Sequence, residues 1–222
     1  SPRGHPAIVR RVACQGGGNP PPMTPFVYPL AAHVRRHGPQ GYADQAGYRP
    51  WLRDEFSFRC IYCLFREQWG RVAGLFDLDH FLPAAHQPRH VAGYDDLLYS
   101  CATCNVAKGD DLIPDPCLYL LNGAVEVRAD GVVEARTPEA SRLVRQLGLD
   151  DRRATEFRLM WISIVEMAAR YDRPLYQRLM GFPDDLPNLA RLRPPGGNTR
   201  PDGIEASYYV KRQNGSLMAT YH

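Results

Sequence analysis

The sequence predicts an α+β fold whose central part is held together by a structural zinc ion. Four of the six cysteines form two Cys-x-x-Cys pairs, at residues 60–63 and 101–104, and two such pairs are typical of a zinc site. Short apolar runs between and after these pairs have the alternation and the turn residues of strands. Two later stretches repeat apolar residues at helical spacing. The 222 residues suffice for one domain with extensions, or at most for two small domains.

The composition is that of an ordinary globular protein. Apolar residues make up 44% of the chain, the formal net charge is +3, and lysine occurs only at Lys108 and Lys211. The preference for arginine suits bidentate phosphate contacts, and it equally fits a bias in base composition. The sequence has no run of 18 apolar residues that could span a membrane, and its first residues lack the apolar segment of a signal peptide. We therefore expect a cytoplasmic protein with reduced thiols.

Three segments outside the cysteine-containing region are expected to differ in how well ordered they are. Residues 1–25 contain glycine and proline runs without an apolar period, which favours a flexible leader. Residues 26–59 are expected to form an N-terminal helical segment, because apolar residues recur at helical spacing from residue 42 to 58. Residues 183–222 are rich in Pro, Gly and polar residues, so we expect a loosely ordered C-terminal arm.

Residues 114–182 are expected to form an accessory unit of a β-hairpin and two helices. Residues 118–121 and 125–127 flank Asn122-Gly123, which is the strongest short hairpin signal. We therefore expect these two segments to pair as strands, with residues 132–135 as a third short strand.

Both accessory helices are predicted from apolar residues that share one face. The first follows Pro138 and ends at Gly148. Its apolar face consists of Ala140, Leu143, Val144 and Leu147. The second covers residues 152–171, and we expect its apolar stripe to pack in the core. That stripe consists of Phe157, Met160, Trp161, Ile164, Val165 and Ala168.

The cysteine pairs predict a structural zinc site with Cys60, Cys63, Cys101 and Cys104 as its four ligands. A Cys-x-x-Cys turn presents two thiolates toward one point, and two turns complete a tetrahedron. A redox dithiol or a chance spacing is the alternative for one pair, and the repetition of the spacing argues against both. Four sulfur ligands leave no open position, so this zinc would stabilise the fold and would not take part in catalysis.

Between the cysteine pairs lies a strand-like run, residues 75–83, which Pro83 ends. Adjacent residues on a regular strand point to opposite faces, so Asp79 and His80 can face one site only if the strand ends or bulges there. Pro83 favours such an ending. The second cysteine pair then runs directly into residues 105–109, which we expect to begin a helix.

These residues carry a resemblance to a known family. Asp79-His80-Phe81-Leu82-Pro83, then Asp96-Leu97, then Cys101-x-x-Cys104-Asn105-x-x-Lys108-Gly109 resembles the HNH endonucleases, also called ββα-metal or His-Me finger nucleases. Within that family the chain is similar to the branch in which two zinc knuckles flank the motif. The match covers about residues 56–113, and it implies a zinc-bound ββα-metal nuclease core over residues 60–113.

The resemblance implies a role for each matched residue. Asp79 would bind a catalytic Mg²⁺ or Mn²⁺ ion, and Asn105 would be the second ligand through its amide oxygen. His80 would be the general base that takes a proton from the attacking water. Asp96 stands where the family usually has an asparagine that braces the loop, and a carboxylate can accept the loop's hydrogen bonds but cannot donate one.

The chemistry of these side chains agrees with such roles. A carboxylate and an amide oxygen make a hard, incomplete ligand shell, which suits Mg²⁺ or Mn²⁺. An imidazole that titrates near neutral pH is a natural base for water. Lys108 follows Asn105 at i+3, on the same helix face, and could neutralise a phosphate. We therefore expect metal-dependent hydrolysis of nucleic-acid phosphodiesters, in DNA more than in RNA.

Other interpretations remain open at this point. An isolated Asp79-His80 pair would more often cap a turn, and an isolated Asn105 would more often cap a helix. The leading alternative function is a zinc-dependent nucleic-acid-binding module without cleavage activity. A third is a bacterial phage-defence effector that acts with a protein partner, which would bind through the accessory helices or the C-terminal arm. We expect no membrane partner.

Overall fold

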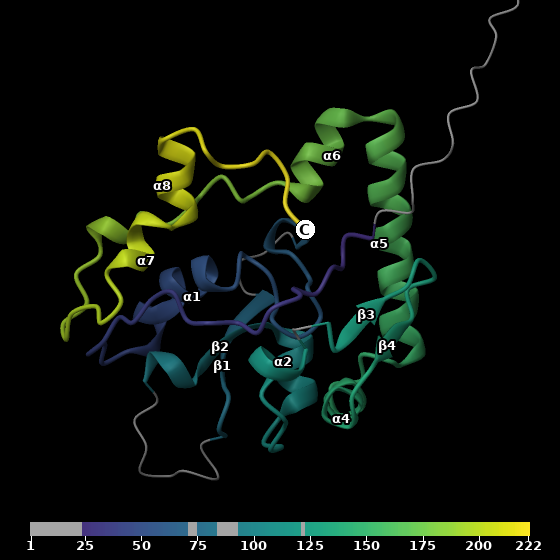
Figure 1. Ribbon diagram of the computed structural model, residues 1–222, viewed down its shortest axis with the longest axis horizontal. Helices are drawn as coiled ribbons and strands as arrows, with labels where there is room; N and C mark the ends of the chain where they lie inside the picture. The colour runs from purple at the N-terminus through teal and green to yellow at the C-terminus, as the bar shows by residue number, and fades with distance from the viewer. Residues whose placement is uncertain (1–23, 71–74, 84–92, 121–122) are drawn as a thin grey trace, which may run out of the picture.

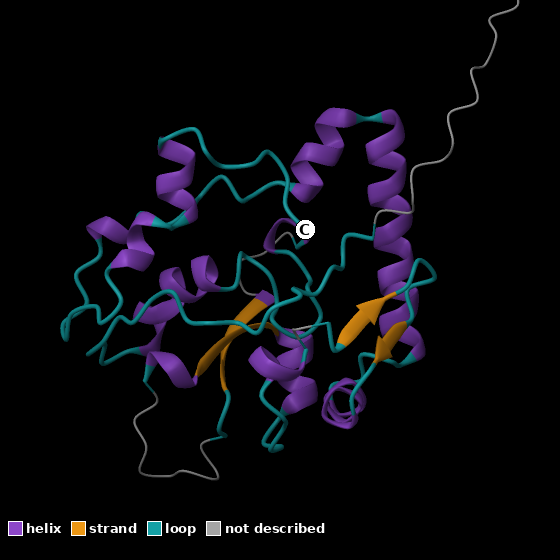
Figure 2. Ribbon diagram, viewed as in Figure 1, coloured by secondary structure: helices purple, strands orange, loops and turns teal. Residues whose placement is uncertain are grey.

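The computed structural model describes residues 24–70, 75–83, 93–120 and 123–222 (Figures 1 and 2). The fold is mixed α+β: helices surround two small antiparallel sheets of two strands each. No helix in these four stretches is long and apolar enough to cross a membrane. Most of the expected leader and Asn122 of the expected hairpin turn lie outside the described residues.

The central unit runs strand, strand, helix. Strand β1 (Phe76–His80) pairs antiparallel with β2 (Leu97–Cys101), and helix α2 (Ala102–Lys108) follows β2 directly. All five residues of β2 are buried, as expected for a strand that is covered on both faces. Gly109 ends α2 with φ +52°, a conformation that glycine adopts without a steric penalty. This unit carries the site residues expected from the sequence, except those of the first cysteine pair and Asp96, which directly precedes β2.

Helix α1 (Arg49–Glu55) packs against β2. A short 3-10 helix, η1 (Gln45–Tyr48), precedes α1, and Pro50 lies in the first turn of α1. Proline is well tolerated there, because the first helical N–H groups have no partner within the helix. Trp51 and Leu52 of α1 are fully buried, so α1 anchors one face of the β1–β2 hairpin. Of the helical segment expected over residues 26–59, residues 45–55 are helical.

The accessory hairpin lies one segment later in the chain than the sequence predicted. Strand β3 (Val125–Val127) pairs with β4 (Val133–Ala135). The prediction of a strand at residues 118–121 is wrong, because Pro116–Tyr119 forms the short helix α3. Its start signal is present in the sequence: the Asp115 side chain accepts a hydrogen bond from the Cys117 N–H, and proline occupies the first turn.

Helices α4 (Pro138–Gln146) and α5 (Arg152–Tyr171) occur where the spacing predicted them. The buried face of α5 differs from the prediction. Val165 and Ala168 are buried, but Phe157, Met160 and Ile164 are largely exposed. The reason is that Arg158 is buried in place of these apolar side chains. Its guanidinium donates hydrogen bonds to the carbonyls of Gly131 and Leu149, each at 2.6 Å. These two bonds fix the rotation of α5 about its axis.

The C-terminal residues are packed, in contrast to the loosely ordered arm that the composition suggested. After α6 (Arg173–Met180) the chain forms α7 (Asp202–Glu205) and α8 (Tyr208–Gln213). Ser207 and Tyr221 are buried. Arg66 donates to the carbonyl of Tyr221 at 2.6 Å, and the Tyr221 hydroxyl donates to the carbonyl of Ser57 at 2.8 Å. The last residues therefore complete the core around the first cysteine pair.

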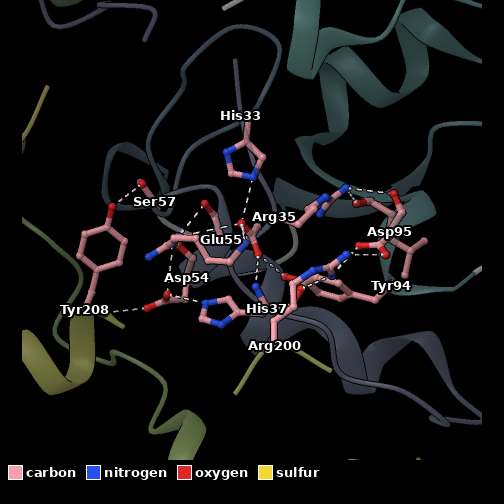
Figure 3. A network of polar contacts seen from close by, with 12 residues as sticks. His33, Arg35, His37, Asp54, Glu55, Ser57, Tyr94, Asp95, Arg200 and Tyr208 are labelled. Atoms are coloured by element: carbon pink, nitrogen blue, oxygen red, sulfur yellow. Dashed lines mark hydrogen bonds and ion pairs between the residues drawn. The ribbon is translucent and has the colours of Figure 1, made fainter. Parts of the chain in front are cut away.

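A buried polar network joins these distant segments (Figure 3). The Glu55 carboxylate, at the end of α1, accepts hydrogen bonds from the backbone N–H groups of Arg36 and His37 and from the Tyr94 hydroxyl, and His33 Nε2 lies 2.9 Å from it. The neighbouring Asp54 carboxylate lies 2.9 Å from His37 Nε2 and accepts from the Tyr208 N–H. Arg200 pairs with Asp95 on the rim of the network. Nothing in the local sequence pattern signals these contacts, because none of them follows a helical or strand period.

Candidate metal centre and the residues beside it

The four cysteines expected to be zinc ligands meet at one point. Their sulfur atoms all lie within 4.8 Å of one another, and the Sγ atoms of Cys63 and Cys101 are 3.7 Å apart. The first pair lies in the turn that leads out of α1, and the second spans the end of β2 and the first turn of α2. Tetrahedral zinc holds sulfur ligands at about 2.3 Å, which requires sulfur–sulfur separations of this order. The four-cysteine cluster therefore fits a structural zinc ion.

The electrostatics of the cluster are compatible with a bound cation. Burial raises the pKa of Cys60, and a hydrogen bond with Cys101 raises the pKa of Cys104. The pKa of Cys101 is lowered, chiefly because Cys104 donates a hydrogen bond to its thiolate. A zinc ion would bind the thiolate forms, so its binding would release protons from these thiols.

Tyr62 connects the four-cysteine cluster to Asp79. It lies between Cys60 and Cys63, and its hydroxyl donates to Asp79 Oδ2 at 2.5 Å. Lys108 Nζ lies 3.1 Å from Asp79 Oδ1 and donates to the His80 carbonyl at 2.7 Å. Asp79 is only 4% exposed. Burial raises its pKa, while the bonds from Tyr62 and Lys108 act in the opposite direction without cancelling the rise.

Lys108, which was expected to contact a phosphate, points into the protein in this structure. It is 2% exposed and forms an ion pair with Asp79, whereas a phosphate contact requires an exposed ammonium group. The reason is that the short helix α2 packs against both strands of the hairpin, which turns this face of the helix inward. Lys108 could contact a phosphate only by leaving Asp79.

Asn105 lies beside a carboxylate that was not among the expected site residues. Its amide Nδ2 is 3.4 Å from Asp77 Oδ2. Asp77 and Asp79 are two residues apart on β1, so both point to the face that α2 covers. The signal was present in the sequence, because residues at i and i+2 of a strand share a face. Asp77, Asp79, Asn105 and Lys108 thus form one polar cluster between β1 and α2.

His80 points to the other face of the hairpin. Its Nε2 atom is 2.7 Å from Nε2 of Gln45, in η1. The β1–β2 register is regular up to the pair His80–Leu97, so no bulge turns His80 toward Asp79. The structure therefore does not bring His80 into the cluster of Asp79 and Asn105, although His80 is the last residue of β1. Gln45 carried no sequence signal, since a lone glutamine in a helical segment marks no motif.

Asp96 lies at the start of β2, at the end of the 3-10 helix η5 (Tyr94–Asp96). Its backbone carbonyl accepts a hydrogen bond from the Phe81 N–H at 2.8 Å. This bond extends the hairpin ladder by one step beyond His80. The proposed role of the Asp96 side chain stays a prediction.

No protein-family model, curated protein or solved structure matches this chain. The resemblance to HNH nucleases therefore rests on the quoted sequence motif.

Proposed function

We propose that this protein is a metal-dependent nuclease that hydrolyses phosphodiester bonds, in DNA rather than RNA. One observation carries the proposal: the consecutive unit β1–β2–α2, with the four-cysteine cluster at its base, places Asp79 and His80 at the end of one strand and Asn105 on the adjoining helix. Adjacent Cα atoms are about 3.8 Å apart. Because the two side chains lie on opposite faces of β1, a phosphate group at the end of the strand would contact both only if His80 leaves Gln45 and turns around the strand end.

The polar cluster has the chemistry that Mg²⁺ or Mn²⁺ requires. The carboxylates of Asp77 and Asp79 and the amide oxygen of Asn105 are hard oxygen donors from two adjacent elements. Such an ion, when bound, neutralises negative charge that develops on the phosphate and on the leaving oxygen. Asp79 would hold it in competition with Lys108, whose ammonium group now balances the charge of that carboxylate.

His80 is the proposed base, which requires its side chain to leave Gln45 and turn from the opposite face of the hairpin toward this cluster. When the Gln45 amide donates to Nε2, the imidazole is neutral and carries its proton on Nδ1. A neutral imidazole can accept a proton from a water molecule that attacks phosphorus. Gln45 would orient the ring and release Nε2 to that water when substrate binds.

A nucleic-acid-binding module without cleavage activity is the second candidate. The specific observation in its favour is that Asp79 is fully engaged by Tyr62 and Lys108, while His80 contacts Gln45 on the opposite face. The role of a phage-defence effector and a protein partner stay predictions.

Plasmid nicking over a Mn²⁺ series separates the two functions. We expect wild-type protein to nick, and His80→Ala to lose about 10²–10⁴-fold in rate, the usual contribution of a positioned base. DNA binding measured in Ca²⁺ should be unchanged in this variant, and His222→Ala serves as the matched histidine control. Cleavage by His80→Ala at the wild-type rate would refute the mechanism. Zinc-dependent DNA binding without any cleavage by wild-type protein would support the binding module instead.

A further inference from the structure

Helix α5 exposes a straight line of large apolar side chains. The line consists of Phe157, Met160, Ile164, Met167 and Tyr171. The steps between them alternate between three and four residues, which is the spacing of a coiled-coil seam. The helix lies along one edge of the molecule (Figure 1), and its other face, with Ile162 and Val165, packs in the core.

The exposed area of this line is in the upper part of the range that monomeric proteins show. Met160 is 49% exposed and Met167 is 59% exposed. Because one fully exposed side chain of this size presents roughly 150–250 Å², the whole line exposes on the order of 500 Å². That is close to the largest apolar patch of a typical monomer, and such patches usually mark an interaction site.

We propose that this line binds the same line on a second copy of the chain, with the two α5 helices antiparallel. Glu156 and Arg170 are 14 residues apart, two full seven-residue repeats, so both lie on one flank of the line. Within its own helix Glu156 pairs with Arg152 and Arg170 pairs with Glu166, and because these pairs are exposed they can be exchanged for pairs between two copies. In an antiparallel pair, Glu156 of one copy lies beside Arg170 of the other, and two-fold symmetry forms this ion pair twice. In a parallel pair the two side chains lie about 21 Å apart along the axis and cannot meet.

This arrangement also pairs the apolar residues. The two-fold axis passes near Ser163, which is midway between Glu156 and Arg170. Met160 then packs on Ile164 of the second copy, and Phe157 packs on Met167 of the second copy. A seam of this length buries about 1,000 Å² in total, at the low end of specific interfaces, so the dimer is weak.

Sedimentation equilibrium up to about 200 µM tests the interface. We expect a reversible dimer, and we expect Met160→Glu to weaken it at least tenfold. Leu159→Glu is the matched control: Leu159 is 43% exposed on the same helix, but it points about 100° away from the line. Circular dichroism verifies that both variants fold. A monomer at the highest concentration, or a dimer that Met160→Glu leaves unchanged, would overturn the proposal.

Charge exchange and cross-linking test the orientation. Arg170→Glu should weaken the dimer several-fold, and adding Glu156→Arg should restore it. In a Cys14→Ser background, Ser163→Cys should give a dimer with a short bismaleimide. Glu166→Cys, which lies on the same flank but about 60° further from the line, should not. Cys117 adds little background, because burial raises its pKa to about 12. Dimerisation that appears only after deletion of residues 1–23 would show that this segment covers the line, and it would refute the proposal for the full chain.

Discussion

Two buried carboxylates, Glu55 and Asp79, have pKa values that the fold shifts in opposite directions. Burial alone would raise the pKa of Glu55, but hydrogen bonds from His33 and the backbone of Arg36 and His37, together with the nearby imidazoles, lower it from 4.5 to about 2. Asp79 receives only the Tyr62 hydroxyl and the Lys108 ammonium, and its pKa stays raised. Glu55 accepts three hydrogen bonds and lies 2.9 Å from His33 Nε2, whereas Asp79 has two partners among the described residues, Tyr62 and Lys108. The number of groups that stabilise the charged form decides the direction of each shift.

The largest expected effect comes from removing one ligand of the four-cysteine cluster, which Tyr62 connects to Asp79. Cys104→Ser should abolish the binding of one zinc per chain and the cooperative unfolding of the central unit, because the free energy of zinc binding is folding energy, about 10–16 kcal/mol in isolated zinc fingers. Atomic absorption and thermal unfolding measure both quantities. Cys117→Ser is the control, since Cys117 lies outside the cluster. Protein that stays folded after complete loss of zinc would contradict a structural role for the four-cysteine cluster.

The next effect concerns Glu55. Because its folded pKa is lowered, its stabilising contribution is complete above pH 4.5 and is lost as the pH falls toward 2. This range corresponds to about 3 kcal/mol of the free energy of unfolding. Urea unfolding at a series of pH values should show that loss in wild-type protein. In Glu55→Gln the pH dependence should be smaller by this amount, while exposed Glu139→Gln should behave as wild type. Identical pH profiles for all three proteins would show that the lowered pKa of Glu55 does not stabilise the folded state.

The smallest effect concerns Tyr62, and it sharpens the description of Asp79. Tyr62→Phe removes one of the two donors to Asp79, so the pKa of Asp79 should rise further, with a loss of about 1 kcal/mol in stability. Carboxyl-selective NMR titration measures the pKa directly. Tyr99→Phe is the matched control, because Tyr99 donates to Glu67 and not to Asp79. An unchanged pKa of Asp79 would show that the four-cysteine cluster and this carboxylate are not coupled.

Features that depend on short-range patterns were predicted well from the sequence. The four-cysteine cluster follows from two repeated spacings, and α5 follows from its apolar period. The features that were missed depend on single long-range polar contacts. Arg158 sets the rotation of α5 through two carbonyls, and Asp54 and Arg66 fix the C-terminal residues. Such contacts have no period, because each is made once between segments far apart in the sequence.

The candidate site shows the same difference between short-range patterns, which the sequence reveals, and long-range contacts, which it does not. The positions of Asp79, His80 and Asn105 along the chain were readable from the motif, but their partners were not. Tyr62 reaches Asp79 across 17 residues, and Gln45 reaches His80 across 35. Asp77 could have been identified, since it shares a strand face with Asp79.

The bond between Arg66 and Tyr221 has a consequence for biosynthesis. It spans 155 residues, so at about 5–20 residues per second the ribosome needs roughly 8–30 s to supply the second partner after the first. During that time the side of the turn around Cys60 and Cys63 that Tyr221 covers stays open to solvent. Contacts of such high contact order also form slowly after release. Until this contact forms, that side of the turn is exposed to proteases and chaperones.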